Sequence, residues 1–216
     1  MADAVIVGKF VGTKGLAAVG ATGTITFLII GFLMGVTTGV TVLTSQKFGA
    51  GRMDEMRKTV GNAAILSAVI AVVMTAVSML GMHRLLVFMH TPEDIFDGAY
   101  GYIMIICAGI FTQVLYNLVS SILRALGNSK TPLYFLILAA GLNIVLDLVF
   151  IIFFHWGAPG AAWATVISQG VSGVLCLIYM WKAVPELKMK KEDWYFNRDI
   201  AVKQISVGIP MGLQYS

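Results

Sequence analysis

Apolar residues form long runs along this chain, and charged residues gather in the shorter segments between the runs. Five runs contain no Asp, Glu, Lys or Arg, or only one. A helix needs about 20 mainly apolar residues to cross a hydrocarbon core about 30 Å thick, and each run is longer than that. The pattern therefore predicts five complete transmembrane helices. Their expected ranges are Gly15–Gln46, Thr59–Met82, Gly98–Leu123, Thr131–Phe154 and Trp156–Trp181.

Two shorter apolar stretches flank these runs. Residues 1–7 look like the end of one helix and residues 200–216 like the beginning of another, and neither can cross a membrane alone. We expect a transmembrane lobe over residues 1–181, then a linker over 182–199 whose mixed charges form a solvated or interfacial surface. Residues 200–216 would begin a second lobe. The expected chain is thus a piece of a larger protein.

The composition excludes several classes of protein. Hydrophobic residues make up 58% of the 216 residues and charged residues only 12%, with a mean hydropathy of +0.85. A soluble domain would need more polar surface. The net charge of +4 is modest and does not indicate a nucleic-acid partner. We predict an all-α polytopic membrane protein, with the lipid bilayer as a partner.

The sequence contains no recognisable enzyme or cofactor motif. GNSKT (127–131) lacks the Gly-Lys pair of a phosphate-binding loop. Cys107 and Cys176 lie inside apolar runs, which favours buried, unreactive thiols. We therefore expect no enzyme activity, no cofactor and no transition-metal centre. Energy for any transport would come from an ion gradient or from a partner.

Basic residues predict how the bundle is oriented. Twelve of the fifteen Lys and Arg residues fall on one side of the expected membrane, and three fall on the other. Cytoplasmic loops are enriched in Lys and Arg, so loops 47–58, 124–130 and 182–199 are expected to be cytoplasmic. The twelve are Lys47, Arg52, Arg57, Lys58, Arg124, Lys130, Lys182, Lys188, Lys190, Lys191, Arg198 and Lys203.

One acid interrupts the fourth run. Asp147 is the only charged residue between Thr131 and Phe154. A charge at the centre of a bilayer costs about 2.5–3.5 kcal/mol on insertion scales, so such an acid is a candidate functional residue. Asn143 lies one turn earlier on the same helix face. Counting from the turn at 155–160 places Thr165 of the next helix at the same depth.

Two further polar residues fall in the same half of the expected bundle. Asp3 precedes the first turn, and Tyr102 lies shortly after the third run begins. Depth alone does not show that these side chains converge. Asn, Ser and Thr in membrane helices commonly join neighbouring helices, which is the alternative explanation for each of them.

Five motifs, in this order, resemble the multidrug and toxic compound extrusion (MATE) transporters. The resemblance covers essentially the whole chain. The motifs are ADAVIVGKFVGTKGLAAVG, SQKFGAG, LRALGNSKTPL, LNIVLDLVFI and GAAWATVISQ.

The resemblance implies a fold and an activity. Family members have twelve helices in two six-helix lobes and export organic, often cationic, compounds in exchange for Na⁺ or H⁺. This sequence looks like the N-terminal lobe with an incomplete first helix, followed by the start of the seventh. The partners implied are organic cations or other xenobiotics and a C-terminal lobe, and the implied location is the plasma membrane. A chain of this length is not expected to transport alone, whether it is a fragment, half of a split transporter or the product of a broken gene.

The resemblance also assigns the polar residues. Asp3 matches the first-helix acid implicated in cation coupling, Asp147 and Asn143 match the fifth-helix acid and its amide neighbour, Thr165 a sixth-helix hydroxyl and Tyr102 a fourth-helix tyrosine. Two carboxylates in a partly desolvated cavity repel each other, so one can hold a proton near neutral pH. Their oxygens, with those of Asn143 and Thr165, could instead hold Na⁺.

Two rival functions stay open at this point. Related flippases carry lipid-linked oligosaccharides and line their cavity with Arg and Lys, whereas the spans here contain no basic residue. The second rival is a membrane scaffold that transports nothing, in which the polar residues only join helices.

Overall fold

The computed structural model describes residues 2–216, and throughout this range the regular structure is helical. The prediction of an all-α polytopic membrane fold is confirmed. The helices are α1 (Ala2–Phe10), α2 (Thr13–Gly49), α3 (Met53–Phe88), α4 (Glu93–Ala108), α5 (Ile110–Ala125), α6 (Lys130–Leu148), α7 (Gly157–Ala183) and α8 (Arg198–Tyr215), with a π-helix η1 (Val149–Phe153) and the 3₁₀ turns η2 (Pro185–Leu187) and η3 (Lys191–Trp194).

Four helices are individually long and apolar enough to cross a membrane: α2, α3, α6 with η1, and α7. The run expected to form a span over Gly98–Leu123 is divided into α4 and α5, which are bent by 45° at a break that contains Gly109. A side chain at Gly109 would come within 2.2 Å of Val166 on α7. The break therefore lies where α7 approaches the backbone most closely, and α4 with α5 supplies the fifth candidate span.

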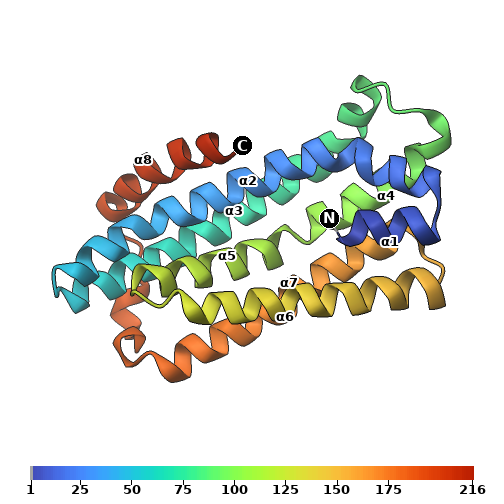
Figure 1. Cartoon of the computed structure of the whole chain (residues 1–216). Coiled ribbons are helices and arrows are strands. Elements are labelled where there is room, and N and C mark those ends of the chain that lie inside the picture. The colour runs from blue at the N-terminus through green and yellow to red at the C-terminus, as the bar shows by residue number, and fades with distance from the viewer. Residues whose placement is uncertain (1) are drawn as a thin grey trace.

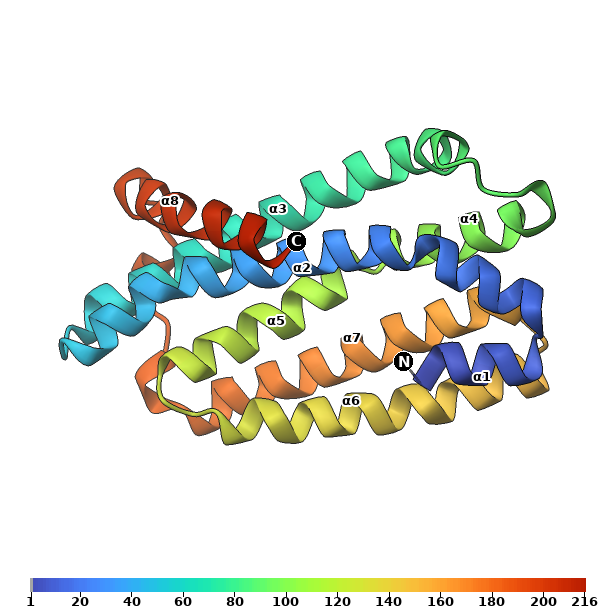
Figure 2. The ribbon, with the colours of Figure 1, turned by 45° about the horizontal axis from the view of Figure 1, so that its top comes forward.

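The long helices run side by side as an elongated bundle (Figures 1 and 2). The short helix α1 turns back at Gly12, whose φ of 91° suits glycine, and contacts α2, α6, α7 and η1. Helices α2, α5 and α7 end at the same end of the bundle, where α3, α6 and α8 begin. We call this the basic end, because the segments there carry the twelve basic residues, and the other the opposite end.

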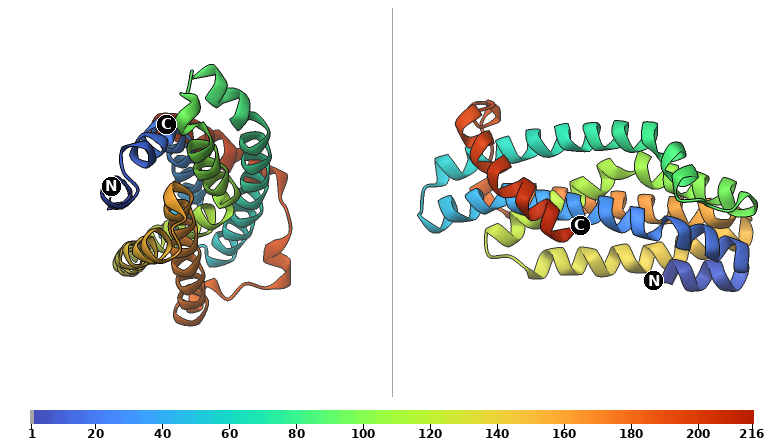
Figure 3. Two further views of the ribbon diagram at one scale, coloured as in Figure 1. Left: turned by 90° about the vertical axis from the view of Figure 1, so that its right-hand side faces the viewer. Right: turned by 90° about the horizontal axis from the view of Figure 1, so that it is seen from above.

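Helix α8 packs on α2 through glycine. A Cβ atom added to Gly35 would lie 2.4 Å from the carbonyl oxygen of Met211, and one added to Gly39 would lie 2.5 Å from the Cα of Gly208. Gly31 meets the backbone of Tyr215 in the same way. Small residues allow helix backbones to approach closely in a membrane, where dispersion contacts drive helix association. Figure 3 shows α8 lying across α2.

The Gln204 side chain joins the beginning of α8 to α2 and α3. Its side chain is fully buried, and its amide nitrogen donates to the carbonyl oxygens of Val40 on α2 at 2.9 Å and Thr59 on α3 at 2.8 Å. Both accepting carbonyls lie inside helices, and one amide group has two hydrogens to donate. A single side chain thus joins three helices.

The linker between α7 and α8 is attached to α3 at a few buried positions, while most of its residues are exposed. Asn62 is fully buried, accepts from the backbone N–H of Asn197 at 2.9 Å and donates to the carbonyl of Tyr195 at 3.4 Å. Asp193 is 4% exposed and forms an ion pair with Arg57 at 3.5 Å. A buried carboxylate needs such a partner. The lysines of the linker remain exposed.

We predict that Gly35→Leu loosens α8 from α2. Overpacking a close contact costs about 1–3 kcal/mol, so amide hydrogen exchange in α8 should become roughly 5- to 150-fold faster. Hydrogen exchange read by mass spectrometry on protein in lipid nanodiscs measures this. Gly23→Leu is the matched control, because a Cβ atom at Gly23 on the same helix meets nothing within 4 Å. Equal exchange in the two variants would contradict the proposed packing.

Candidate functional site

Asp147 lies near the end of α6, two residues before the π-helix η1. π-Helical turns are rare and occur frequently at functional sites. The Asp147 side chain is 0% exposed, and neither of its oxygens has a hydrogen-bond partner among residues 2–216. An ionised carboxylate in this setting is costly unless a proton or a cation compensates its charge.

A hydrogen-bonded bridge brings three of the predicted residues together. The Thr165 hydroxyl on α7 donates to Oδ2 of Asp3 on α1 at 3.0 Å and accepts from Nδ2 of Asn143 on α6 at 3.4 Å. It also lies 3.1 Å from the carbonyl oxygen of Ala161. A hydroxyl has one hydrogen, so Thr165 donates to Asp3 or to Ala161 at any one time.

Tyr102 borders the same region from α4. It is 7% exposed, and it lies close enough to Asp3 and Asp147 to experience both negative charges. The charge of Asp3 also acts on Asp147 directly. Hydrogen bonds thus join Asp3, Asn143 and Thr165, Asp147 lies one turn beyond Asn143 on α6, and Tyr102 lies on α4, which packs on α7. We call Asp3, Tyr102, Asn143, Asp147 and Thr165 the acid site.

The chemistry of the acid site suits a small, hard cation or a proton. Carboxylate, amide and hydroxyl oxygens are the atoms that hard cations prefer, whereas transition metals favour His and Cys. Among the described residues, no group of three or more His, Cys, Asp and Glu side chains could hold a metal ion. Two acids of the site could take up a proton or contact a cation. Asp3 accepts a hydrogen bond from Thr165, whereas Asp147 accepts none from residues 2–216.

The sequence reading missed the polar residues that hold the linker and α8, namely Asn62 and Gln204. Each lies within an apolar stretch, which is a usable signal that its side chain is paired. The partners could not be found in this way, because Asn62 and Asn197 are 135 residues apart in the chain, and Gln204 and Val40 are 164 apart.

Four helices long and apolar enough to cross a membrane, with a bent pair that could form a fifth span, are typical of a helical integral membrane protein. The family model named MatE matches residues 1–149, and the chain belongs to this family. It is 32% identical over 214 residues to the probable multidrug resistance protein YpnP of Bacillus subtilis (strain 168), an alignment that covers 98% of this chain and 47% of YpnP. The chain spans about half the length of the curated relatives it matches.

Superposition on solved structures identifies the same family. An inward-facing multidrug resistance MATE family transporter of the MOP superfamily superposes with a TM-score of 0.90 and 28% identity, over 99% of this chain and 49% of that one. An outward-facing conformation of such a transporter also gives a TM-score of 0.90 at 28% identity, over 99% of this chain and 48% of that one. The resemblance to MATE transporters is confirmed.

We predict that Thr165→Val weakens the attachment of α1 to the bundle. Valine has nearly the shape of threonine but no hydroxyl, so the bonds to Asp3 and Asn143 are lost. Side-chain hydrogen bonds between membrane helices contribute about 0.6 kcal/mol on average, with a maximum near 1.7, so two should cost about 1–2 kcal/mol.

Equilibrium unfolding in mixed detergent micelles measures this loss. Thr165→Ser keeps the hydroxyl and is the matched control, expected to lie within about 0.5 kcal/mol of the parent. If the valine and serine variants are equally stable, the bridge does not hold α1.

Proposed function

We propose that this chain is the N-terminal half of a cation-coupled antiporter, and that the acid site holds the coupling ion, Na⁺ or H⁺. The compounds exported would be organic and often cationic. The observation that carries the proposal is the fully buried Asp147 carboxylate, which has no hydrogen-bond partner in the described chain and lies beside a second acid. Such an arrangement favours the uptake of one positive charge.

Each residue of the acid site has a proposed part. Asp147 takes the proton or faces the Na⁺, and Asp3 supplies a second carboxylate. Asn143 offers its amide oxygen, because its amide nitrogen already donates to Thr165. Thr165 donates to Asp3 while Asp3 is charged and turns to the Ala161 carbonyl when Asp3 is protonated or its lone pairs face a cation. Tyr102 closes the site on the α4 side.

Exchange of the cation for the drug follows if both compete for the negative charge of Asp3 and Asp147. An organic cation favours the state in which the acids are ionised, and a proton or Na⁺ favours the state in which they are neutralised. If the two lobes of a complete transporter expose the site to opposite sides with different affinities, the cation gradient drives export. Equal TM-scores to inward-facing and outward-facing transporters support a lobe that moves largely as one body.

The proposed setting is a multi-pass protein of the plasma membrane. The excess of Lys and Arg supports a cytoplasmic position for the basic end, with loops 47–58, 124–130 and 182–199. Residues 1–181 would form the N-terminal lobe, 182–199 the connection between lobes and 200–216 the first part of the C-terminal lobe.

One observation argues against each of the two rival functions. A carrier of anionic lipid-linked sugars would need positive charge within the spans, and the expected spans contain none. A passive scaffold would use its buried polar groups to join helices, but neither oxygen of Asp147 bonds to any described residue.

We predict that Asp147→Asn in the complete transporter reduces ethidium efflux from cells to the level of the empty vector. The amide keeps the shape of the side chain and removes the charge that a cation or proton compensates. The level of the protein in the membrane fraction should stay unchanged, because an amide costs less to insert than an acid. Asp97→Asn, which changes an exposed acid at the opposite end, is the matched control. Full efflux by the Asp147 variant would overturn the proposed role.

The same ethidium efflux assay shows whether H⁺ or Na⁺ is the coupling ion. A protonophore should stop efflux if H⁺ is coupled, and removal of external Na⁺ should stop it if Na⁺ is coupled. Efflux that survives both treatments would exclude a cation-coupled antiporter and favour the rival functions.

A further inference from the structure

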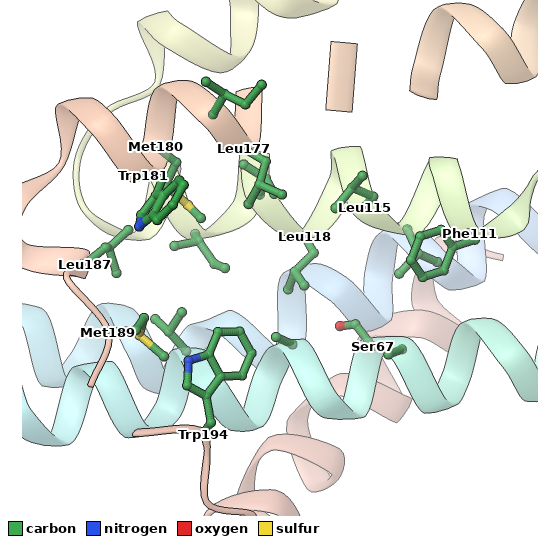
Figure 4. A pocket seen from close by; sticks show the side chains of 17 residues that line it. Ser67, Phe111, Leu115, Leu118, Leu177, Met180, Trp181, Leu187, Met189 and Trp194 are labelled. Atoms are coloured by element: carbon green, nitrogen blue, oxygen red, sulfur yellow. The ribbon is translucent and has the colours of Figure 1, made fainter. Parts of the chain in front are cut away.

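A large apolar pocket lies between α3, α5, α7 and the linker. Its volume is about 710 Å³, within the range of about 300–1,000 Å³ that is typical of small-molecule sites. Ser67 is the one hydroxyl-bearing side chain among its lining residues. Figure 4 shows Leu118 of α5, Trp181 of α7 and Trp194 of the linker turned toward this space.

The pocket is separate from the acid site. Leu177 lines it from α7 and lies twelve residues after Thr165, or about 18 Å along the helix at 1.5 Å per residue. None of its lining residues comes from α1, α2, α6 or α8. Helix α8 packs on α2 and does not line the pocket (Figure 3).

The linker forms one wall of the pocket through Leu187, Met189 and Trp194. This wall is held in place by Asn62 and by the ion pair between Arg57 and Asp193. Apolar side chains of a loop are thus fixed over a gap between membrane helices. A gap lined in this way excludes polar ligands and suits a hydrocarbon chain.

Three lysines lie in the same wall, together with the acids Glu186 and Glu192 and with Asp193, which is paired with Arg57. Lys188 lies between two pocket-lining residues, Leu187 and Met189, and Lys190 and Lys191 follow directly. All three lysines are exposed. Arg57, by contrast, is already paired with Asp54 and Asp193. The exposed lysines next to the pocket-lining Leu187 and Met189 therefore favour an anionic head group, although Glu186 and Glu192 offset part of their charge.

Two tryptophans lie at the edge of the pocket. Trp181 is 74% exposed and Trp194 is 54% exposed, although both line the cavity. Tryptophan is enriched at the level of lipid head groups, where one part of the ring is wet and the rest is apolar. Their position places the mouth of the pocket at the membrane surface of the basic end.

We propose that this pocket binds an anionic phospholipid from the leaflet at the basic end. Its acyl chains occupy the apolar space between α3, α5 and α7, and its phosphate pairs with Lys188, Lys190 and Lys191. The assignment combines an apolar cavity, a rim of unpaired lysines and interfacial tryptophans at one place. It does not depend on transport by the acid site.

Native mass spectrometry of the complete transporter, with phosphatidylglycerol or phosphatidylcholine added, tests the proposal. We expect one phosphatidylglycerol to be retained tightly and phosphatidylcholine to be retained weakly. Replacing Lys188, Lys190 and Lys191 by Gln should weaken phosphatidylglycerol binding about 100-fold, at roughly fivefold for each lysine. Ala68→Trp, which fills the pocket from α3, should weaken binding of both lipids.

Matched controls separate the site from ordinary lipid contact. Lys130→Gln removes a charge at the basic end outside the linker, and Ala76→Trp adds a ring at an exposed position of α3 that does not line the pocket. Both should bind like the parent. The lysine variant changes exposed side chains only, so its folding is not at risk.

Other outcomes would overturn the proposal. Equal retention of both lipids by the parent would mean nonspecific lipid around the protein. Unchanged retention by both the triple lysine variant and Ala68→Trp would place the lipid elsewhere. Retention of an added apolar drug in preference to either lipid would assign the pocket to a different ligand. Because lipid binding is read without transport, failure of efflux through the acid site would leave this result unaffected.

Discussion

The rest of this lobe is arranged around one constraint: an acid buried in a membrane bundle needs its charge compensated. Asp147 has no hydrogen-bond donor from the described chain, whereas Asp3 receives one from Thr165. A site in which every oxygen was satisfied by the protein would have little affinity for a cation. The two acids therefore differ: Asp3 is hydrogen-bonded to α7 through Thr165, and Asp147 is the acid to which we assign the proposed proton or Na⁺.

The remaining polar contacts give the lobe its rigidity. Gln204 joins α8 to α2 and α3, and Asn62 holds the linker on α3. Glycines on α2 allow α8 to lie very close, since Cβ atoms added to them would overlap its backbone. Residues 200–216, which we propose to begin the C-terminal lobe, thus contact α2 and α3 directly, so these contacts lie at the proposed junction between the lobes.

The sequence predicted the features that depend on residues close together in the chain. Long apolar runs located the spans, and the expense of one acid in such a run identified Asp147, with Asn143 on its face and Thr165 at its depth. Asp3 and Tyr102 received roles only through the family resemblance, because depth does not fix direction. The bend at Gly109 and the buried Asp193 were not predicted, since each depends on a neighbour, Val166 or Arg57, that is distant in sequence.

The ligands that we propose for the acid site and for the pocket have charges of opposite sign, and both sites include residues of α7. No ion pair joins the linker lysines to Asp3 or Asp147 among residues 2–216. A connection between the two sites could run through an element that they share. Helix α7 provides one, because it carries Thr165 at one level and Trp181 at the other. A lipid that packs against α7 and the linker would hold this corner in one arrangement, whichever cation the acids bind.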